Sequence, residues 1–230
     1  MASHSPSAFA GTSRVTVWSH VFSGESDLPI EFIQLLDDGE IEKCRRYRLP
    51  EERRRFVAGR ALLRKGLSAY TGQDPKFWHF ELGDACKTKI SATSETFPLD
   101  FSVAHSGKVV LVAVSDVGPC GIDVEKVNPS ALSHPMEGIF TQSESTEMDR
   151  LPKALRDVQL IRYWTAKEAY AKYRGLGFHL DFLSFEASFD PPKIHHLRGL
   201  NEQAVELQTE ELKIGRDTYF WSLVTKSEPE

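Results

Sequence analysis

Two kinds of periodicity in the apolar positions outline the elements of this chain. From about 51 to 70, apolar side chains recur at helical spacing, and Gly72 fits the end of that helix. A second long helix is predicted from about 152 to 174, where the sequence GLG ends it, and a shorter one near 140–149. Short apolar or alternating runs predict strands at 13–22, 78–82, 101–104, 109–115, 120–127, 182–189, 204–209 and 218–226.

The order of these elements is similar in the two halves of the chain. We therefore predict an α+β fold of two similar lobes, each a long helix packed on a small, mainly antiparallel sheet. The expected divisions are a disordered leader at 1–13, an N-terminal lobe at 14–117 and a C-terminal lobe at 118–230. The turn SDVGP predicts that strands 109–115 and 120–127 pair as a hairpin. Because small ligands commonly bind in clefts between domains, we expect the active site between the lobes.

The strand CGIDVEKV carries two carboxylates directly after the most apolar run of the chain, VVLVAV. Side chains alternate along a strand, so Asp123 and Glu125 point to the same face. One interpretation is a solvated outer face, since charged residues are mostly exposed. The other is a site for a hard cation such as Mg²⁺, which takes carboxylate ligands and keeps several waters.

The second long helix contains YWTAKEAYAK, in which Glu168 and Lys172 share a face. A glutamate followed by a lysine four residues later is common as a surface pair. The aromatic neighbours Tyr163, Trp164 and Tyr170 are unusual for a solvated stripe. A helical carboxylate facing the strand carboxylates would complete a magnesium site, and Lys172 would then reach an anion bound there.

His105 follows strand 101–104 in the sequence FSVAHSG and is expected in a turn. A turn histidine is commonly capped or solvated. This turn precedes the apolar strand 109–115, however. We therefore treat His105, with Ser106 and the Gly107 backbone, as a candidate anion-binding group.

The composition is that of a soluble globular protein, with 40% hydrophobic and 27% charged residues. No apolar run reaches the roughly 18–20 residues that span a membrane, and the first residues lack the features of a secretory signal. Cys44, Cys86 and Cys120 show no C-x-x-C spacing. We therefore expect a cytoplasmic protein with reduced thiols and no membrane partner.

Charge is distributed unevenly along the chain. The net charge is -5, but residues 43–65 contain ten Lys and Arg against two Glu. An acidic protein is not expected to bind nucleic acid. The basic segment indicates either a compact anionic ligand, such as a phosphorylated cofactor, or a solvated helix face.

Several of these segments together resemble the Sfp-type 4′-phosphopantetheinyl transferases. The resemblance rests on FSVAHSG, GIDVEK and WTAKEAYAK in this order, with RRRFVAGRALLR before them and IFTQSE between the last two. It covers about 43–177. It implies an enzyme that transfers the 4′-phosphopantetheine arm of coenzyme A to a serine of an acyl or peptidyl carrier protein and releases 3′,5′-ADP. It also implies Mg²⁺, with Mn²⁺ as the alternative ion. Because one chain holds both lobes, we expect a monomer.

The resemblance also implies roles for individual residues. Asp123, Glu125 and Glu168 would hold the metal ion, and Glu168 would act as general base directly or through a bound water. The expected catalytic residues are Glu168, Lys172 and His105. The expected coenzyme A contacts are Lys43, Arg55, His105, Ser106, Lys167 and Lys172, with Arg60 and Arg64 as weaker candidates.

Two features depart from the family pattern. The sequence GDACKTKISAT stands where the family has a G-K-P stretch, which leaves Lys87 and Lys89 as alternatives for its lysine. The turn SVAHS has Ser102 and Ala104 where Asn and Ser are commoner. A relative that binds coenzyme A or a carrier protein with weak or no catalysis therefore stays an alternative. A magnesium-dependent nuclease is a second one, disfavoured by the acidic charge.

Overall fold

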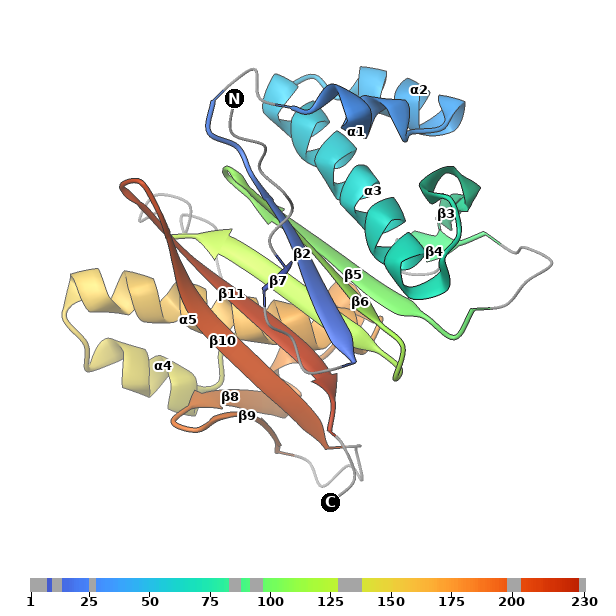
Figure 1. Cartoon of the computed structure of the whole chain (residues 1–230). Helices are drawn as coiled ribbons and strands as arrows, with labels where there is room; N and C mark the ends of the chain where they lie inside the picture. Colours follow the sequence, from blue (N-terminus) through green and yellow to red (C-terminus); the bar gives the residue numbers. More distant parts are fainter. Residues whose placement is uncertain are drawn as a thin grey trace. The chain divides into compact units, whose positions relative to one another are not determined.

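The computed structural model describes residues 8–9, 14–24, 28–82, 88–91, 97–127, 138–197 and 204–227. Contacts within it divide the chain into two compact units, Met1–Pro119 and Cys120–Glu230. Figure 1 shows the elements of both units. None of the helices in the described ranges has the length and apolar character that crossing a bilayer requires.

An antiparallel sheet with the strand order β1-β2-β6-β5 forms the centre of the first unit. All seven residues of β6 are buried, because β2 and β5 flank this strand and helix α3 covers it. The strands are β1 (Ala8–Phe9), β2 (Val15–Val21), β5 (Asp100–Ser106) and β6 (Val109–Ser115).

Helix α3 (Pro50–Thr71) packs on this sheet and supplies Leu62, Leu63 and Leu67 to the core (Figure 1). Pro50 at the first turn and Gly72, which adopts φ 73°, define its ends. The sheet approaches the helix closely at Gly66, where a Cβ would lie 2.9 Å from a methyl group of Val114.

Short elements surround α3 in the first unit. Helix α1 (Ile30–Gln34) is followed by α2 (Asp38–Arg46), which begins with a capping box. In that box the Asp37 carboxylate accepts from the backbone N–H of Glu40, and the Glu40 carboxylate accepts from that of Asp37. A 3₁₀ turn, η1 (Pro75–Phe77), leads to the paired strands β3 (Phe80–Leu82) and β4 (Thr88–Ile90).

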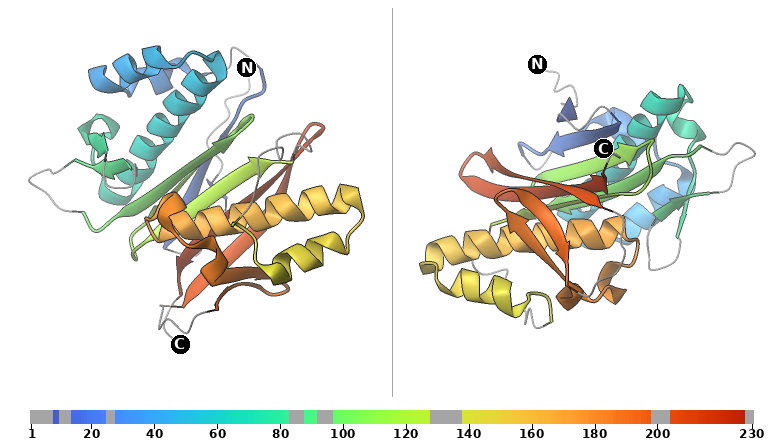
Figure 2. Two further views of the ribbon diagram at one scale, coloured as in Figure 1. Left: turned by 180° about the vertical axis from the view of Figure 1, so that it is seen from behind. Right: turned by 90° about the horizontal axis from the view of Figure 1, so that it is seen from below.

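The second unit has an antiparallel sheet with the order β10-β11-β7. Helix α5 packs along β7 and β11, with α4 beside it (Figure 2). Tyr163, Ala166, Ala169 and Tyr170 of α5 are buried against the sheet and the β8–β9 pair. The elements are β7 (Cys120–Lys126), α4 (Gln142–Asp149), α5 (Lys153–Tyr173), η3 (Gly177–His179), η4 (Phe182–Ser184), β8 (Phe185–Phe189), β9 (Pro192–His196), β10 (Val205–Ile214) and β11 (Asp217–Lys226).

These elements confirm the predicted α+β class, since each unit packs one long helix on an antiparallel sheet. The predicted hairpin of strands 109–115 and 120–127 is wrong. Strand β7 pairs with β11, because β2 and β5 already occupy both edges of β6. His105 lies within β5 opposite Val110, and not in the turn that follows the strand.

The expected leader at 1–13 is described only at Ala8–Phe9. These two residues form β1 and pair with β2 at Val17 and Trp18, so at least this part of the leader belongs to the sheet. The rest of that segment lies outside the described residues.

Candidate functional site

Strand β7 presents its two carboxylates to helix α5. Asp123 and Glu125 alternate with Ile122 and Val124, and therefore share the face of Gly121. That face lies on α5, because a Cβ at Gly121 would be 2.0 Å from the carbonyl oxygen of Ala169. Asp123 is only 4% exposed, so the interpretation of a solvated outer face is wrong for this residue.

Helix α5 brings Lys172 into direct contact with Asp123. The Lys172 ammonium donates to Asp123 Oδ1 at 2.7 Å and to the carbonyl of Ile122 at 3.1 Å. The second carboxylate oxygen, Asp123 Oδ2, is buried and accepts no hydrogen bond from the described residues. A buried carboxylate oxygen without a donor is unfavourable, and it marks the place where a positive group would be stabilised.

The electrostatics of this cluster show an excess of negative charge. The pKa of Glu168 is raised to about 7. Burial is the main cause, the negative charge of Asp123 adds to it, and the positive charge of Lys172 opposes both. Burial lowers the pKa of Lys172, but Asp123, Glu168 and Glu125 outweigh this and leave it above its ordinary value. One ammonium thus faces three carboxyl groups.

The donor set at this cluster fits a hard cation. Within the described residues, no three His, Cys, Asp or Glu side chains are gathered closely enough to hold a metal ion by themselves, so Asp123, Glu125 and Glu168 do not form a ready three-ligand group. The ammonium of Lys172 occupies one oxygen of Asp123. The buried Oδ2 of Asp123 and the carboxyl of Glu168 supply oxygen ligands of the kind that Mg²⁺ prefers, and Mg²⁺ usually keeps several waters.

The raised pKa of Glu168 predicts a pH-dependent stability. Its folded pKa of about 7 exceeds the ordinary value of 4.5, so the folded state is destabilised as pH rises through this interval. We expect Glu168→Gln to raise the melting temperature at pH 8, measured with a chelator present, and to have little effect at pH 4.5. The raised pKa corresponds to a change of at most roughly 3 kcal/mol in the free energy of unfolding. An equal change at both pH values would contradict the prediction.

The structure corrects the role expected for Lys167. Its side chain is fully buried in the second unit, where the ammonium lies 2.9 Å from Glu144 Oε2 and donates to the carbonyls of Phe182 and Phe185. All of its donors are used internally. Lys167 therefore ties α4 and the start of β8 to α5, and these three contacts leave no ammonium proton for a ligand.

A pocket of about 230 Å³ in the first unit brings together three of the predicted coenzyme A contacts. Lys43 comes from α2, Arg55 from α3 and His105 from β5. Ser106 does not line this pocket. Additional lining residues are Tyr47, Phe56, Gly59, Arg60, Leu63, Thr88 and Val103.

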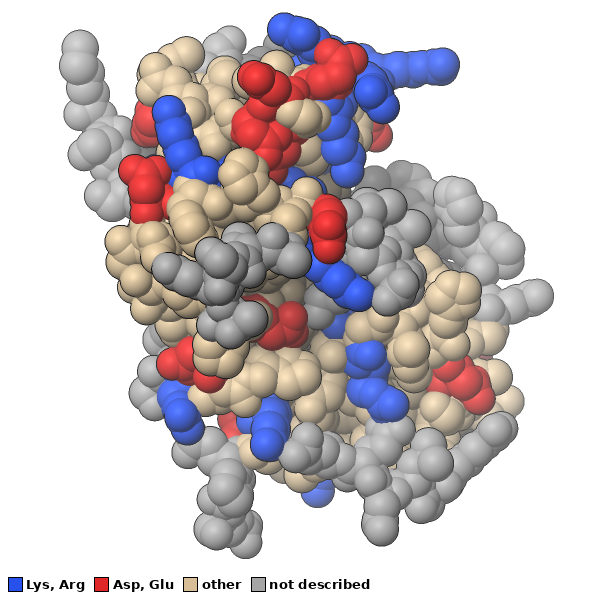
Figure 3. Space-filling model, turned by 90° about the vertical axis from the view of Figure 1, so that its right-hand side faces the viewer, with Lys and Arg blue, Asp and Glu red and all other residues tan. Residues whose placement is uncertain are grey.

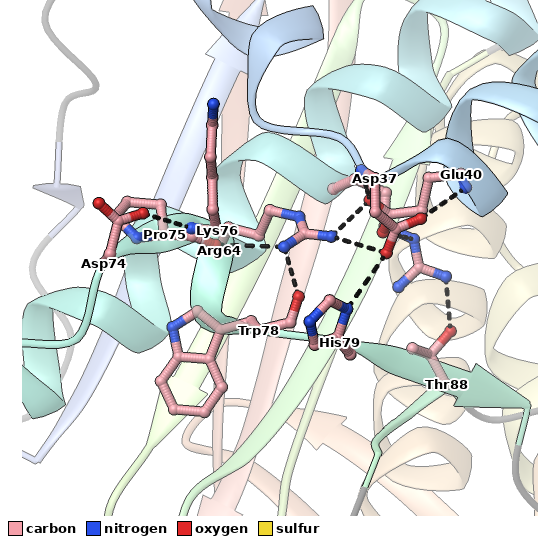
Figure 4. Close-up of polar contacts among 10 residues, drawn as sticks. Asp37, Glu40, Arg64, Asp74, Pro75, Lys76, Trp78, His79 and Thr88 are labelled. Carbon is pink, nitrogen blue, oxygen red and sulfur yellow. Dashed lines mark hydrogen bonds and ion pairs between the residues drawn. The ribbon is translucent and has the colours of Figure 1, made fainter. Parts of the chain in front are cut away.

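Two arginines of α3, one partly buried and one buried, connect this helix to the elements beside the pocket. Arg64 is 1% exposed; it donates to Glu40 at 2.6 Å, to Asp37 at 3.2 Å and to the carbonyl of Trp78. Figure 4 shows these groups around Arg64. Arg60 contacts Glu40 at 3.4 Å and donates to Thr88 at 3.3 Å. Arg64 thus fastens α2 to α3 and is not available to a ligand, whereas Arg60 reaches the pocket.

Cationic side chains continue outside the pocket on α2. Figure 3 shows one face of the protein on which Lys and Arg side chains lie beside acidic ones. A second hollow of about 410 Å³ is lined by Gly39, Lys43, Arg46 and Tyr47, and it shares Lys43 and Tyr47 with the first. The basic segment therefore forms pocket walls and is more than a solvated helix face.

Comparison with known proteins places this chain in a family. The family model described as the 4′-phosphopantetheinyl transferase superfamily matches residues 119–223. The 4′-phosphopantetheinyl transferase HetI of Nostoc sp. is 34% identical over 143 residues, which are 62% of this chain and 60% of that protein. The 4′-phosphopantetheinyl transferase AcpT of Salmonella typhi is 30% identical over 146 residues, which are 62% of this chain and 71% of that protein. The chain belongs to the 4′-phosphopantetheinyl transferase superfamily.

The match to this superfamily includes the whole carboxylate cluster of the second unit. Residues 119–223 contain Asp123, Glu125, Glu168 and Lys172. The matched region spans only 58–62% of the length of the first three curated transferases. Among solved structures, a holo-(acyl-carrier-protein) synthase from Bacillus anthracis in complex with CoA (3′,5′-ADP) aligns with a TM-score of 0.40 at 25% identity, covering 48% of this chain and 96% of that one.

The structure also shows pocket and core residues that the sequence did not single out. Thr88 lines the pocket from the stretch that replaces the family's G-K-P, and Tyr47 lines it from the basic segment. Lys89 is exposed on β4, and Lys87 lies outside the described residues. Glu144, the last residue of IFTQSE, is the buried partner of Lys167. The sequence shows the segments that contain Thr88, Tyr47 and Glu144, but the contacts of these residues depend on the fold.

Proposed function

We propose that this chain transfers the 4′-phosphopantetheine arm of coenzyme A to a serine of an acyl or peptidyl carrier protein. The observation that carries the proposal is the buried Asp123 carboxylate, which holds Lys172 on one oxygen and has no donor on the other. Glu168 lies close enough to Asp123 for their charges to interact. All three residues fall within the region that matches the transferase superfamily.

In this reaction the carrier serine oxygen forms a bond to the β-phosphorus of coenzyme A. The bond from that phosphorus to the bridging oxygen breaks, and 3′,5′-ADP leaves with the bridging oxygen. Glu168 accepts the proton of the serine hydroxyl, and a pKa of about 7 suits a base working near neutral pH. Lys172, whose pKa is raised, stays charged and stabilises the negative charge of the leaving phosphate.

Asp123, Glu125 and Glu168 would hold Mg²⁺ together with waters and diphosphate oxygens. Bound there, the ion would supply positive charge to the diphosphate. Asp123 has a second role in this arrangement, because its hydrogen bond orients the Lys172 ammonium.

The pocket of the first unit supplies the groups for the 3′-phosphate of coenzyme A. Arg55 and Lys43, which line this pocket, are the cationic groups that would bind it. Arg55 Nε is buried and has no partner among the described residues, while Nη1 donates to the carbonyl of Gly107 at 3.3 Å. A guanidinium with an unused donor suits bidentate phosphate contact. We expect Ser106 and His105 to contact the diphosphate.

The 3′-phosphate assignment predicts a selective loss of affinity. Arg55→Ala should weaken binding of 3′,5′-ADP about tenfold to a hundredfold, since a charged hydrogen bond contributes about 1.5–3 kcal/mol. Binding of 5′-AMP, which lacks the 3′-phosphate, should change little. Titration calorimetry measures both ligands, and Arg45→Ala removes an equal charge from an exposed site on α2 as a control. Equal losses for the two nucleotides would reject the assignment.

Intact mass spectrometry tests the proposed transfer directly. The protein is mixed with an unmodified carrier protein, coenzyme A and Mg²⁺, and an EDTA sample serves as control. We expect the carrier to gain the mass of one phosphopantetheine, and EDTA to prevent the gain. No gain with carriers from several pathways, while coenzyme A still binds, would favour a binding protein without transferase activity.

A further inference from the structure

The hydroxyl group of Thr88 lies in the wall of the first unit's pocket and has a proton to donate. Thr88 belongs to β4, and its Oγ1 is 3.3 Å from Arg60 Nη2. A guanidinium can only donate, so Thr88 Oγ1 is the acceptor of this hydrogen bond. The proton of the hydroxyl therefore points elsewhere, and no described residue accepts it. Thr88 thus offers the pocket a donor that the fold itself does not use.

Arg60 is held in place on several sides, which fixes its side of the hydrogen bond to Thr88. The guanidinium lies 3.4 Å from Glu40 Oε1, and its side chain is only 13% exposed. It also lies over two aromatic rings, 5.4 Å from the centre of Phe56 and 5.0 Å from that of Phe80. These contacts come from α2, α3 and β3. Because Arg60 occupies the Thr88 oxygen from a fixed direction, the hydroxyl proton is restricted to the remaining directions.

The chemistry of the pocket wall indicates what kind of acceptor suits Thr88. Lys43 and Arg55 supply the positive charge for a phosphate. The apolar side chains of Phe56 and Val103 line the same pocket. A single uncharged donor beside apolar side chains suits an uncharged acceptor on a flat ring. The ring nitrogens of adenine are acceptors of this kind.

We propose that Thr88 is a specificity-determining residue whose hydroxyl donates a hydrogen bond to a ring nitrogen of the adenine of coenzyme A. The inference rests on the proposed function, because the nucleotide is the one that transfer would release as 3′,5′-ADP. It assigns the contact to a threonine side chain in GDACKTKISAT, the stretch that departs from the family pattern. Such a donor disfavours a ligand that offers no acceptor at this place, because a buried hydroxyl would then stay unpaired.

Titration calorimetry on the full chain tests this contact with two ligands, 3′,5′-ADP and ribose 3,5-bisphosphate, which carries both phosphates but no base. Thr88→Val keeps the shape of the side chain and suits a strand. It leaves the ring nitrogen without its donor, so we expect the affinity for 3′,5′-ADP to fall about tenfold, equivalent to about 1.4 kcal/mol. The affinity for ribose 3,5-bisphosphate should change by less than about twofold, the usual spread for independent sites.

Two further variants separate the loss of the hydroxyl from a disturbance of β4. Thr88→Ser keeps the donor, and its affinity for 3′,5′-ADP should stay within about threefold of the unmodified protein. Thr146→Val removes a hydroxyl from α4 in the second unit and serves as a matched control. Thermal melting of each variant checks folding.

The possible results distinguish this contact from the proposed function. An unchanged affinity of Thr88→Val for 3′,5′-ADP would overturn the inference and leave the transfer reaction in place. The same holds for equal losses in the Val and Ser variants, and for equal losses with the two ligands. Failure of the unmodified protein to bind 3′,5′-ADP would overturn the proposed function and the inference with it.

Discussion

Replacing Glu168 with Gln is expected to lower the rate of phosphopantetheine transfer by about a hundredfold to ten-thousandfold, the usual contribution of a general base. Glutamine keeps the size of the side chain but cannot accept the serine proton. The loss should appear in kcat and persist at saturating coenzyme A, because the site proposed for the 3′-phosphate is the pocket of the first unit, which does not include Glu168. Initial rates from intact mass spectrometry provide the measurement.

Asp123→Asn is the companion variant, with an expected loss of similar size. It removes the charge that holds Lys172 at 2.7 Å and the carboxylate that would bind the cation. Glu206→Gln, on an exposed position of β10, serves as a matched control for loss of one carboxylate from the second unit. The metal-site hypothesis is ruled out if Asp123→Asn or Glu168→Gln, correctly folded, retains transfer close to that of the control.

Gly121→Ala is expected to be the most disruptive small substitution in the second unit. The new Cβ would lie 2.0 Å from the carbonyl oxygen of Ala169 and 2.4 Å from the backbone nitrogen of Tyr173. These are backbone atoms of α5 and cannot rotate away, so the helix must move off the sheet. We expect a loss of at least about 3 kcal/mol in the free energy of unfolding.

The consequences of that movement should extend to the carboxylate cluster. Lys172 lies between Ala169 and Tyr173 on α5, and its contact with Asp123 requires the close approach that Gly121 permits. The free energy of unfolding, measured by urea denaturation, and the transfer rate should therefore fall together. Gly24→Ala introduces the same methyl group where no atom lies within 4 Å and serves as control. A Gly121→Ala protein as stable and active as this control would show that the tight contact is not required.

The sequence predicted the main elements and the composition of the carboxylate cluster. Helical spacing located both long helices, and alternation along GIDVEK placed Asp123 and Glu125 on one face. Such periodicities follow from local backbone geometry, which is why they can be predicted without the fold. The motif order then indicated the family that the comparisons confirm.

Contacts between distant segments could not be predicted in this way. Lys167 and Lys172 belong to one motif, yet Lys167 is buried against Glu144 while Lys172 reaches Asp123. Helix geometry predicts that the two lysines point in different directions, but it does not predict that Glu144 and Asp123 are their partners. The same is true of Thr88, which enters the pocket only because β4 lies beside Arg60.

By itself, the sequence determined which residue types stand on β7 and α5, because side-chain spacing within one element is a local property. Only the tertiary structure decided that β7 pairs with β11, since both edges of β6 were already taken. That pairing sets Ser222 opposite Asp123, and α5 brings the Lys172 ammonium to one oxygen of this carboxylate. The surroundings of Asp123, including the oxygen that accepts no hydrogen bond from the described residues, thus result from three segments meeting in the core, and no single segment encodes them.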